Sequence, residues 1–256
     1  MLPAAVLTDL DGTLLDRGGV LGAEARAAVA GLRKRGIPVV PLTSKTEVEL
    51  RAFLAGLDLG GLGSFENGAG VVSSRGTLVS ERAVPVAELS ARLAELARLS
   101  GLALVPAGAL PEAEIRRRTG LPAEKVPAML ARGYGLPFLA PDGADGALAR
   151  AAGALPGVRL TRGGQFWHLS GEHGKEDAVG LLLRAGLVAR PLAGLGDAPN
   201  DAGFLALCDA AVILPRERGG ADPSLAAALP GARVAPFPEG RGWSAAVAEL
   251  LREGPP

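Results

Sequence analysis

The chain has little of the chemistry that would point to secretion, to nucleic acid or to a membrane. Its 256 residues include one cysteine, Cys208, and carry a formal net charge of +0. A single cysteine excludes an internal disulfide and is typical of a reducing compartment. Balanced charge gives nucleic acid no basic surface, and no apolar run is long enough to span a bilayer. The N-terminus lacks the pattern of a signal peptide. We expect a cytoplasmic enzyme, and the oligomeric state stays open.

Several polar side chains are scarce, which makes the positions that keep them informative. Asparagine occurs only at 67 and 200, glutamine only at 165, and histidine only at 168 and 173. Few amides together with many arginines and prolines fit a thermophile, although GC-rich coding would give a similar bias. We expect that the positions of these rare polar residues require them.

Strands alternate with helices at both ends of the chain, which predicts an α/β fold with a parallel sheet. We expect strands that start at Val6 and at 37–42, 62–66, 192–195 and 210–214, a hairpin at 71–79, and helices at 23–35, 46–57, 175–185, 200–207 and 241–251. Binding sites in such sheets form beyond the carboxyl ends of the strands.

The middle of the chain has a different pattern. An amphipathic helix carries Leu89, Leu93, Leu96 and Leu99. Short elements punctuated by proline and glycine follow, with helices expected near 122–131 and 144–154 and strands near 157–161 and 165–169. We predict a second α/β module at 81–170, inserted into a core made of 1–80 and 171–256.

The first polar cluster is Asp9-Leu10-Asp11-Gly12-Thr13, at the end of the first strand. Side chains two apart on a strand share a side, so we expect Asp9 and Asp11 to present two carboxylates that raise each other's pKa. A divalent cation would offset their repulsion. One carboxylate would then attack an electrophile while the other moves a proton. A plain Asp-Gly turn is the alternative, but a turn requires neither the strand nor the second aspartate.

Two further clusters carry hydroxyl groups and a cation. Thr43-Ser44-Lys45 follows a strand, where hydroxyls would bond phosphoryl oxygens. Thr43 or Ser44 would equally serve as the N-cap of the next helix. Lys175 begins a helix, where the helix dipole disfavours a cation, so a solvated lysine is the alternative there.

The last cluster is Gly196-Asp197-Ala198-Pro199-Asn200-Asp201, again at the end of a strand. It brings up to three more oxygen ligands to the edge of the sheet. Asn200 would alternatively cap the following helix while Asp197 meets a metal.

In this order, Asp9-x-Asp11-Gly12-Thr13, Thr43-Ser44, Lys175 and Gly196-Asp197-x-x-Asn200-Asp201 resemble the motifs of haloacid-dehalogenase-like phosphatases. The resemblance covers the whole chain, because the inserted module lies between the second and third motifs. That position and the mixed composition are those of a type IIB α/β cap. The resemblance implies a Rossmann-like parallel sheet as the core.

The resemblance also implies roles. Asp9 would be the nucleophile that forms an aspartyl-phosphate, and Asp11 would act first as the acid and then as the base. Thr43, with Ser44, would bond the phosphoryl oxygens, and Lys175 would spread their charge.

The implied cofactor is Mg²⁺. It would be held by Asp9, the main-chain carbonyl of Asp11 and Asp197, with Asn200 or Asp201 in support.

A narrower resemblance concerns the substrate. Thr43-Ser44-Lys45-Thr46, Glu66-Asn67-Gly68-Ala69, Arg132-x-Tyr134-x-x-Pro137-Phe138 and Gly163-Gly164-x-Phe166-Trp167-His168 look like mannosyl-3-phosphoglycerate phosphatases. These enzymes make the compatible solute mannosylglycerate, so a small phosphorylated glycoside is implied. Family members usually carry Glu, Ser and Glu where this chain has Gly133, Gly135 and Leu136.

Seven residues are expected to contact the substrate: Ser44, Lys45, Asn67, Arg132, Tyr134, Gln165 and His168. Arg132 would take the glycerate carboxylate, and Gln165 and His168 would bond sugar hydroxyls. The plain alternatives are that Arg132 ends a helix in solvent, that His168 packs in the cap, and that Asn67 belongs to a turn.

Three other functions stay open. Another type II phosphatase would act on a hexose phosphate, on sucrose phosphate or on a flavin precursor. A phosphomutase would share the nucleophile but return the phosphoryl group. A phospho-accepting signalling module would not turn over, although receiver-type modules are about half this length and lack the insertion.

Overall fold

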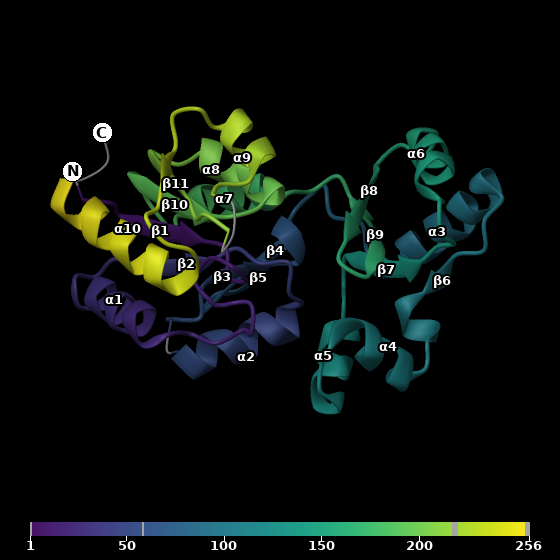
Figure 1. Cartoon of the computed structure of the whole chain (residues 1–256), viewed down its shortest axis with the longest axis horizontal. Helices are drawn as coiled ribbons and strands as arrows, with labels where there is room; N and C mark the ends of the chain where they lie inside the picture. The colour runs from purple at the N-terminus through teal and green to yellow at the C-terminus, as the bar shows by residue number, and fades with distance from the viewer. Residues whose placement is uncertain (1, 58, 217–219, 254–256) are drawn as a thin grey trace.

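Five parallel strands form the main sheet, in the order β12-β11-β10-β1-β2 (Figure 1). The structure is a computed structural model and describes residues 2–57, 59–216 and 220–253. The strands are β1 (Ala5–Thr8), β2 (Val39–Pro41), β10 (Leu192–Gly196), β11 (Ala210–Ile213) and β12 (Arg233–Val234). They are short and mostly apolar, as expected of a sheet covered on both faces.

Helices cover both faces of this sheet. The helices α1 (Ala23–Lys34) and α10 (Glu239–Glu253) lie on one face, and α7 (Lys175–Arg184), α8 (Ala202–Ala206) and α9 (Pro223–Ala228) lie on the other (Figure 1). Neighbouring residues of β1 show the alternation, because Val6 packs with α1 and α10 while Leu7 packs with α7 and α8. The predicted α/β fold with a parallel sheet is confirmed.

A small antiparallel sheet lies beside β2. Its strands are β3 (Gly63–Phe65), β4 (Gly70–Ser73) and β5 (Gly76–Val79), and the predicted hairpin is the β4–β5 pair. The helix α2 (Glu47–Leu57) connects β2 to β3. This part of the chain carries Thr43-Ser44-Lys45 at the end of β2 and Glu66-Asn67-Gly68-Ala69 after β3.

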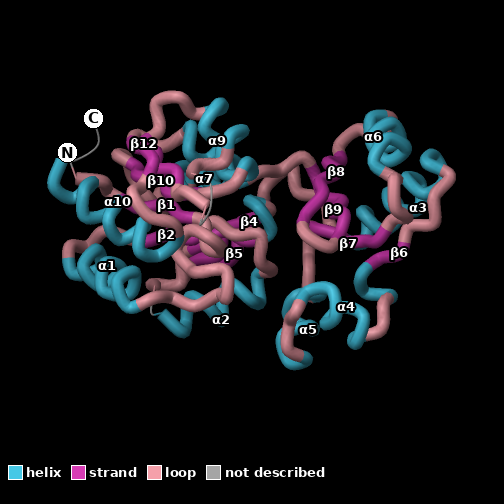
Figure 2. Tube along the Cα trace, in the orientation of Figure 1, coloured by secondary structure: helices cyan, strands magenta, loops and turns pink. Residues whose placement is uncertain are grey.

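The inserted segment builds a separate four-stranded antiparallel sheet, in the order β6-β7-β9-β8 (Figure 2). Its strands are β6 (Val105–Pro106), β7 (Gly135–Leu139), β8 (Val158–Gly163) and β9 (Phe166–Gly171). Its helices are α3 (Val86–Ser100), α4 (Glu112–Thr119), α5 (Val126–Leu130) and α6 (Asp145–Gly153). The buried leucines of α3 and α6 cover one face of this sheet, and Figure 1 shows that this face is turned away from the main sheet. The division at 80/81 and 170/171 stays a prediction.

The sequence pattern missed the shortest elements and misjudged one strand. It did not predict α4, α9, β6, β7 or β12. The strand β7 contains Gly135 and Pro137, residue types that strands disfavour. The first strand ends at Thr8 and therefore does not include Asp9 or Asp11. Within the described ranges, no helix has both the length and the apolar character that crossing a bilayer takes.

We expect a large loss of stability from Leu7→Ala, because Leu7 lies fully buried at 0% exposure in the centre of the main sheet. The cavity should lower the free energy of unfolding by about 3 kcal/mol. Leu2→Ala removes the same atoms from a side chain that is 49% exposed and should cost less than ~0.5 kcal/mol. Urea denaturation followed by circular dichroism measures both. Equal losses would contradict this account of the core.

Candidate active site

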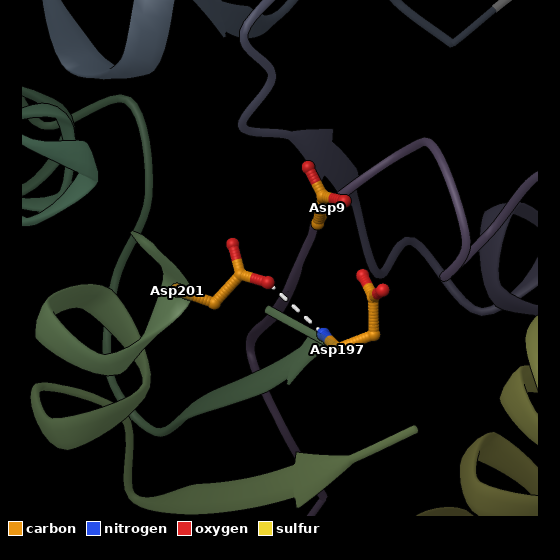
Figure 3. A group of neighbouring side chains, drawn as sticks. All are labelled: Asp9, Asp197 and Asp201. Carbon is orange, nitrogen blue, oxygen red and sulfur yellow. Dashed lines mark hydrogen bonds between the residues drawn. The ribbon is translucent and has the colours of Figure 1, made fainter. Parts of the chain in front are cut away.

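Three aspartates meet at the carboxyl ends of two neighbouring strands. Asp9 directly follows β1 and Asp197 directly follows β10, and these two strands pair in parallel. Asp201 ends the short 3-10 turn that precedes α8. One carboxylate oxygen from each of the three lies within 4.8 Å of the others (Figure 3). Parallel pairing therefore creates the cluster, because it aligns the ends of strands that are distant in sequence.

Lys175, the first residue of α7, holds two of these carboxylates. Its side chain is 1% exposed, and Nζ lies 2.6 Å from Oδ1 of Asp9 and 2.6 Å from Oδ1 of Asp201. The alternative of a solvated lysine is wrong. The two carboxylates raise the pKa of Lys175 against the effect of its burial, so the ammonium stays charged at neutral pH.

The other oxygen of Asp201 holds the backbone. Its Oδ2 accepts the N–H of Asp197 at 2.9 Å, drawn in Figure 3, and the N–H of Ala198 at 3.0 Å. Asp201 therefore satisfies the free N–H groups at this turn, the role that the sequence assigned to Asn200 as a possible cap. That part of the prediction is wrong.

The cluster has more negative charge than Lys175 can balance. Burial raises the pKa of Asp9 to about 7, and the pKa of Asp197 is also raised by burial, although Thr13 donates a 2.8 Å hydrogen bond to it. With all three aspartates ionised, one ammonium leaves two negative charges uncompensated. Buried carboxylate oxygens in this arrangement are the donor set that a hard divalent cation takes. The residues present fit such an ion.

Asp11 lies apart from this cluster. Because β1 ends at Thr8, Asp11 is half-exposed in the following loop, and its Oδ2 lies 2.8 Å from Nζ of Lys45. The expectation that Asp9 and Asp11 share a strand face is wrong, because the strand ends before both residues. Burial, Asp201 and Asp197 raise the pKa of Asp9. The Asp11–Lys45 pair joins the loop after β1 to the loop after β2.

The loop after β2 carries the predicted hydroxyl groups. Thr43 is buried, and its Oγ1 accepts the N–H of Lys45 at 3.2 Å, while Ser44 is exposed. Neither residue caps α2. Thr46 and Glu49 do so reciprocally, since Glu49 Oε2 accepts the N–H of Thr46 at 2.9 Å and Thr46 Oγ1 accepts the N–H of Glu49 at 3.2 Å. The capping alternative for Thr43 and Ser44 is wrong, which leaves the Ser44 hydroxyl without a role in the helix end.

The two asparagines of the chain meet. Asn200 Nδ2 donates to Oδ1 of Asn67 at 3.2 Å. Asn67 has a φ of 56° and lies in a tight turn with Gly68, whose φ is 92°. A Cβ at Gly68 would lie 1.9 Å from the carbonyl oxygen of Gly174. The turn therefore requires glycine, and it places Asn67 beside the start of α7.

The predicted cap residues lie in different places. In the register of β7, β8 and β9, His168 pairs with Pro137 and Thr161 on the face that α3 and α6 leave open. Burial and the nearby Arg132 lower the pKa of His168 to about 4, so it is neutral. Gln165 is exposed in the turn between β8 and β9.

Arg132 and Tyr134 contact the part of the molecule that is built around the main sheet. Arg132 Nη1 donates to the carbonyl oxygen of Ser44 at 3.2 Å. The ring of Tyr134 lies 6.2 Å from that of Phe65, between ring centres. Contact of Arg132 and Tyr134 with the substrate stays a prediction.

Sequence reasoning missed two residues near the site. Thr13 orients Asp197 through its hydroxyl, and a Cβ at Gly12 would lie 2.8 Å from Oδ2 of the same carboxylate. The Gly-Thr ending of the first motif was the available signal for both. Glu66 also received no role, although a glutamate that is only 3% exposed is rare.

The comparisons with known proteins agree with this geometry. Residues 6–103 match the haloacid dehalogenase-like hydrolase family. A glucosyl-3-phosphoglycerate/mannosyl-3-phosphoglycerate phosphatase of Persephonella marina is 28% identical over 97% of this chain and 97% of its own. A protein of the same name from Methanococcoides burtonii is 25% identical over 86% of this chain and 88% of its own.

Solved structures share the fold over nearly the whole length. A haloacid dehalogenase-like hydrolase from Bacteroides thetaiotaomicron has a TM-score of 0.73 at 17% identity and covers 96% of this chain and 98% of its own. A HAD subclass IIB sugar phosphatase has a TM-score of 0.70 at 14% identity, with 98% of each chain covered. At these identities the likeness concerns the fold, and it confirms the core with an inserted α/β cap.

We expect the affinity for a divalent cation to fall as the pH drops through about 7. The raised pKa of Asp9, about 7, and the raised pKa of Asp197 mean that protons compete with the cation for these carboxylates below that pH. Isothermal titration calorimetry with Mg²⁺ at pH 8 and pH 6 measures the affinity and the protons released. The same affinity at both values would contradict the assignment.

Proposed function

We propose that this chain, which has the sequence motifs and the fold of the haloacid dehalogenase-like hydrolases, is a Mg²⁺-dependent phosphatase of phosphate monoesters. The observation that carries the proposal is the buried cluster in which Lys175 shares its Nζ between Asp9 and Asp201 beside Asp197. The cluster keeps one oxygen of the nucleophile engaged and surrounds it with groups that stabilise a transferring phosphoryl group.

In the first step Asp9 attacks phosphorus. Lys175 holds Oδ1 of Asp9, which leaves Oδ2 to form the new bond to phosphorus while the bond from phosphorus to the ester oxygen breaks. Asp11, which is half-exposed in the loop after β1, enters this step protonated and gives its proton to the departing alkoxide. The products of this step are an alcohol and an aspartyl-phosphate on Asp9.

In the second step Asp11 takes a proton from water. The oxygen of that water bonds to phosphorus, the bond between phosphorus and Asp9 Oδ2 breaks, and inorganic phosphate leaves. The buried Thr43 and the exposed Ser44 after β2 donate hydrogen bonds to the phosphoryl oxygens. Asp9 returns to its starting state.

Asp9 and Asp197, with the main-chain carbonyl of Asp11, would hold the Mg²⁺. When bound, the ion neutralises charge on the phosphoryl oxygens. Asp201 supports this site from behind, because its oxygens are engaged by Lys175 and by two backbone N–H groups. Asn200, which lies beside Asp201 in the turn Pro199–Asp201, would also support it.

The proposed substrate is a glycosyl-3-phosphoglycerate, most directly mannosyl-3-phosphoglycerate, with mannosylglycerate as the product. The names of the two relatives support it. The open face of the cap sheet adds a neutral His168, which would bond a sugar hydroxyl. The thermophilic and cytoplasmic setting stays a prediction from composition.

Asp9→Asn should abolish phosphate release, with kcat lower by at least ~10³-fold, because an amide is not a nucleophile toward phosphorus. Malachite-green detection of inorganic phosphate with Mg²⁺ present measures the rate. Asp142→Asn changes the same side chain at an exposed position of the cap and should leave the rate unchanged. Retention of Mg²⁺-dependent turnover in Asp9→Asn would show that the mechanism is wrong.

A panel of phosphate esters should rank the substrates. We expect the highest kcat/KM with mannosyl- and glucosyl-3-phosphoglycerate, and lower values with hexose 6-phosphates and nucleotides. Phosphate release is measured for each ester at equal Mg²⁺. A strong preference for a hexose 6-phosphate would overturn the substrate assignment and leave the reaction class standing, and phosphoryl return without release would indicate a mutase.

A further inference from the structure

Glu66 lies beside the main sheet, outside the cap, but its carboxylate is directed into the cap. It follows β3, has a φ of 44°, and its side chain is 2% exposed. Its Oε1 accepts the N–H of Gly133 at 2.8 Å, and its Oε2 accepts the N–H of Tyr134 at 3.0 Å. Both amides lie in the segment 132–135, which connects α5 to β7. Hydrogen bonds to an ionised acceptor are strong ones, so this carboxylate fastens the cap.

The backbone of Glu66 is tied to the site on its other side. Its N–H donates to the carbonyl oxygen of Lys45 at 2.8 Å. The N–H of the following residue, Asn67, donates to the carbonyl oxygen of Thr43 at 2.9 Å. The carbonyl oxygen of Glu66 lies 3.0 Å from Nε2 of His173, in the segment that returns the chain from the cap. Glu66 therefore connects the cap, the Thr43–Lys45 loop after β2 and the segment that returns from the cap.

Arg132 closes the same connection. Its Nη1 lies 3.2 Å from the carbonyl oxygen of Ser44 and 3.9 Å from Oε2 of Glu66, and its side chain is 14% exposed. Close by, the hydroxyl of Thr46 lies 2.9 Å from the carbonyl oxygen of Ala128 in α5. Arg132 thus contacts the Thr43–Lys45 loop and lies beside the carboxylate of Glu66.

The two glycines of the segment fit this arrangement unequally. A Cβ at Gly135 would lie 3.1 Å from Oε2 of Glu66, whereas a Cβ at Gly133 would lie 3.9 Å from Oε1. Neither glycine has a positive φ, so alanine fits the backbone at both positions. A side chain at position 135 would therefore crowd the Glu66 carboxylate where it accepts the two N–H groups, and glycine leaves room for it there.

We propose that Glu66 is a positioning residue, which holds the segment 132–135 and Arg132 against the Thr43–Lys45 loop so that substrates reaching into the cap are turned over. The inference rests on the proposed phosphatase function. A residue that only stabilised the fold would affect all esters alike. A positioning residue affects esters that use the cap more than small esters that react without it.

The test compares Glu66→Gln and Gly135→Ala with the matched control Gly108→Ala in the full chain, because a Cβ at the exposed Gly108 of the cap would meet nothing within 4 Å. For mannosyl-3-phosphoglycerate, kcat/KM should fall about tenfold in the first two and less than twofold in the control. With para-nitrophenyl phosphate, the losses in the first two should be at least threefold smaller than with the glycoside. Equal losses on both esters, or no loss on the glycoside, would overturn the proposal.

A second measurement does not depend on activity. Amide hydrogen exchange at Gly133 and Tyr134 should quicken at least tenfold in Glu66→Gln and Gly135→Ala and stay unchanged in the control. Unchanged exchange in both variants would overturn the proposal. If the unmodified chain releases no phosphate from any ester, the proposed function fails, and the exchange data still decide whether Glu66 holds the cap segment.

Discussion

The buried ammonium of Lys175 is the contact on which the site depends. Two carboxylates within 2.6 Å of Nζ compensate its burial, and it in turn compensates theirs. Removing one partner from such a group costs about 3–5 kcal/mol, because a buried charge is left unpaired. The interaction also joins three elements that are distant in sequence: the end of β1, the start of α7 and the turn before α8. The remaining negative charge makes this edge of the sheet a place for a divalent cation.

In the proposed function, chemistry and substrate choice lie on different parts of the molecule, and the hydrogen bonds of Glu66 connect these two parts. Asp9 and Asp197 follow strands of the main sheet and Lys175 begins α7, whereas the cap sheet presents His168 from its open face. Hydrogen bonds between the two parts include those made by backbone groups at Gly133, Tyr134, Ser44 and Ala128. Backbone contacts of this kind hold the relative position of the two parts without fixing the side chains that face the substrate.

Much of the fold and the catalytic cluster could be predicted, because both depend on local patterns. Helices with regular apolar spacing were found within a few residues of their observed ends, and the motifs at strand ends identified Asp9, Asp197 and Lys175. The five elements that were missed, α4, α9, β6, β7 and β12, have two to eight residues each, and so short a segment gives no reliable period. The prediction that Asp9 and Asp11 share a strand face was wrong, because the strand ends at Thr8 and side-chain alternation no longer applies beyond it.

The sequence by itself determined the class of fold and the residue types available for the reaction, because burial patterns and strand-end motifs are local properties of the chain. Only the tertiary structure decided which groups meet. Lys175 and Asp9 are 166 residues apart, and Glu66 and Gly133 are 67 apart. Partners at such separations leave no periodic trace, because sheet pairing and the docking of the cap bring them together. The hydrogen bond from Arg132 to the carbonyl oxygen of Ser44, 88 residues apart in sequence, is a further example.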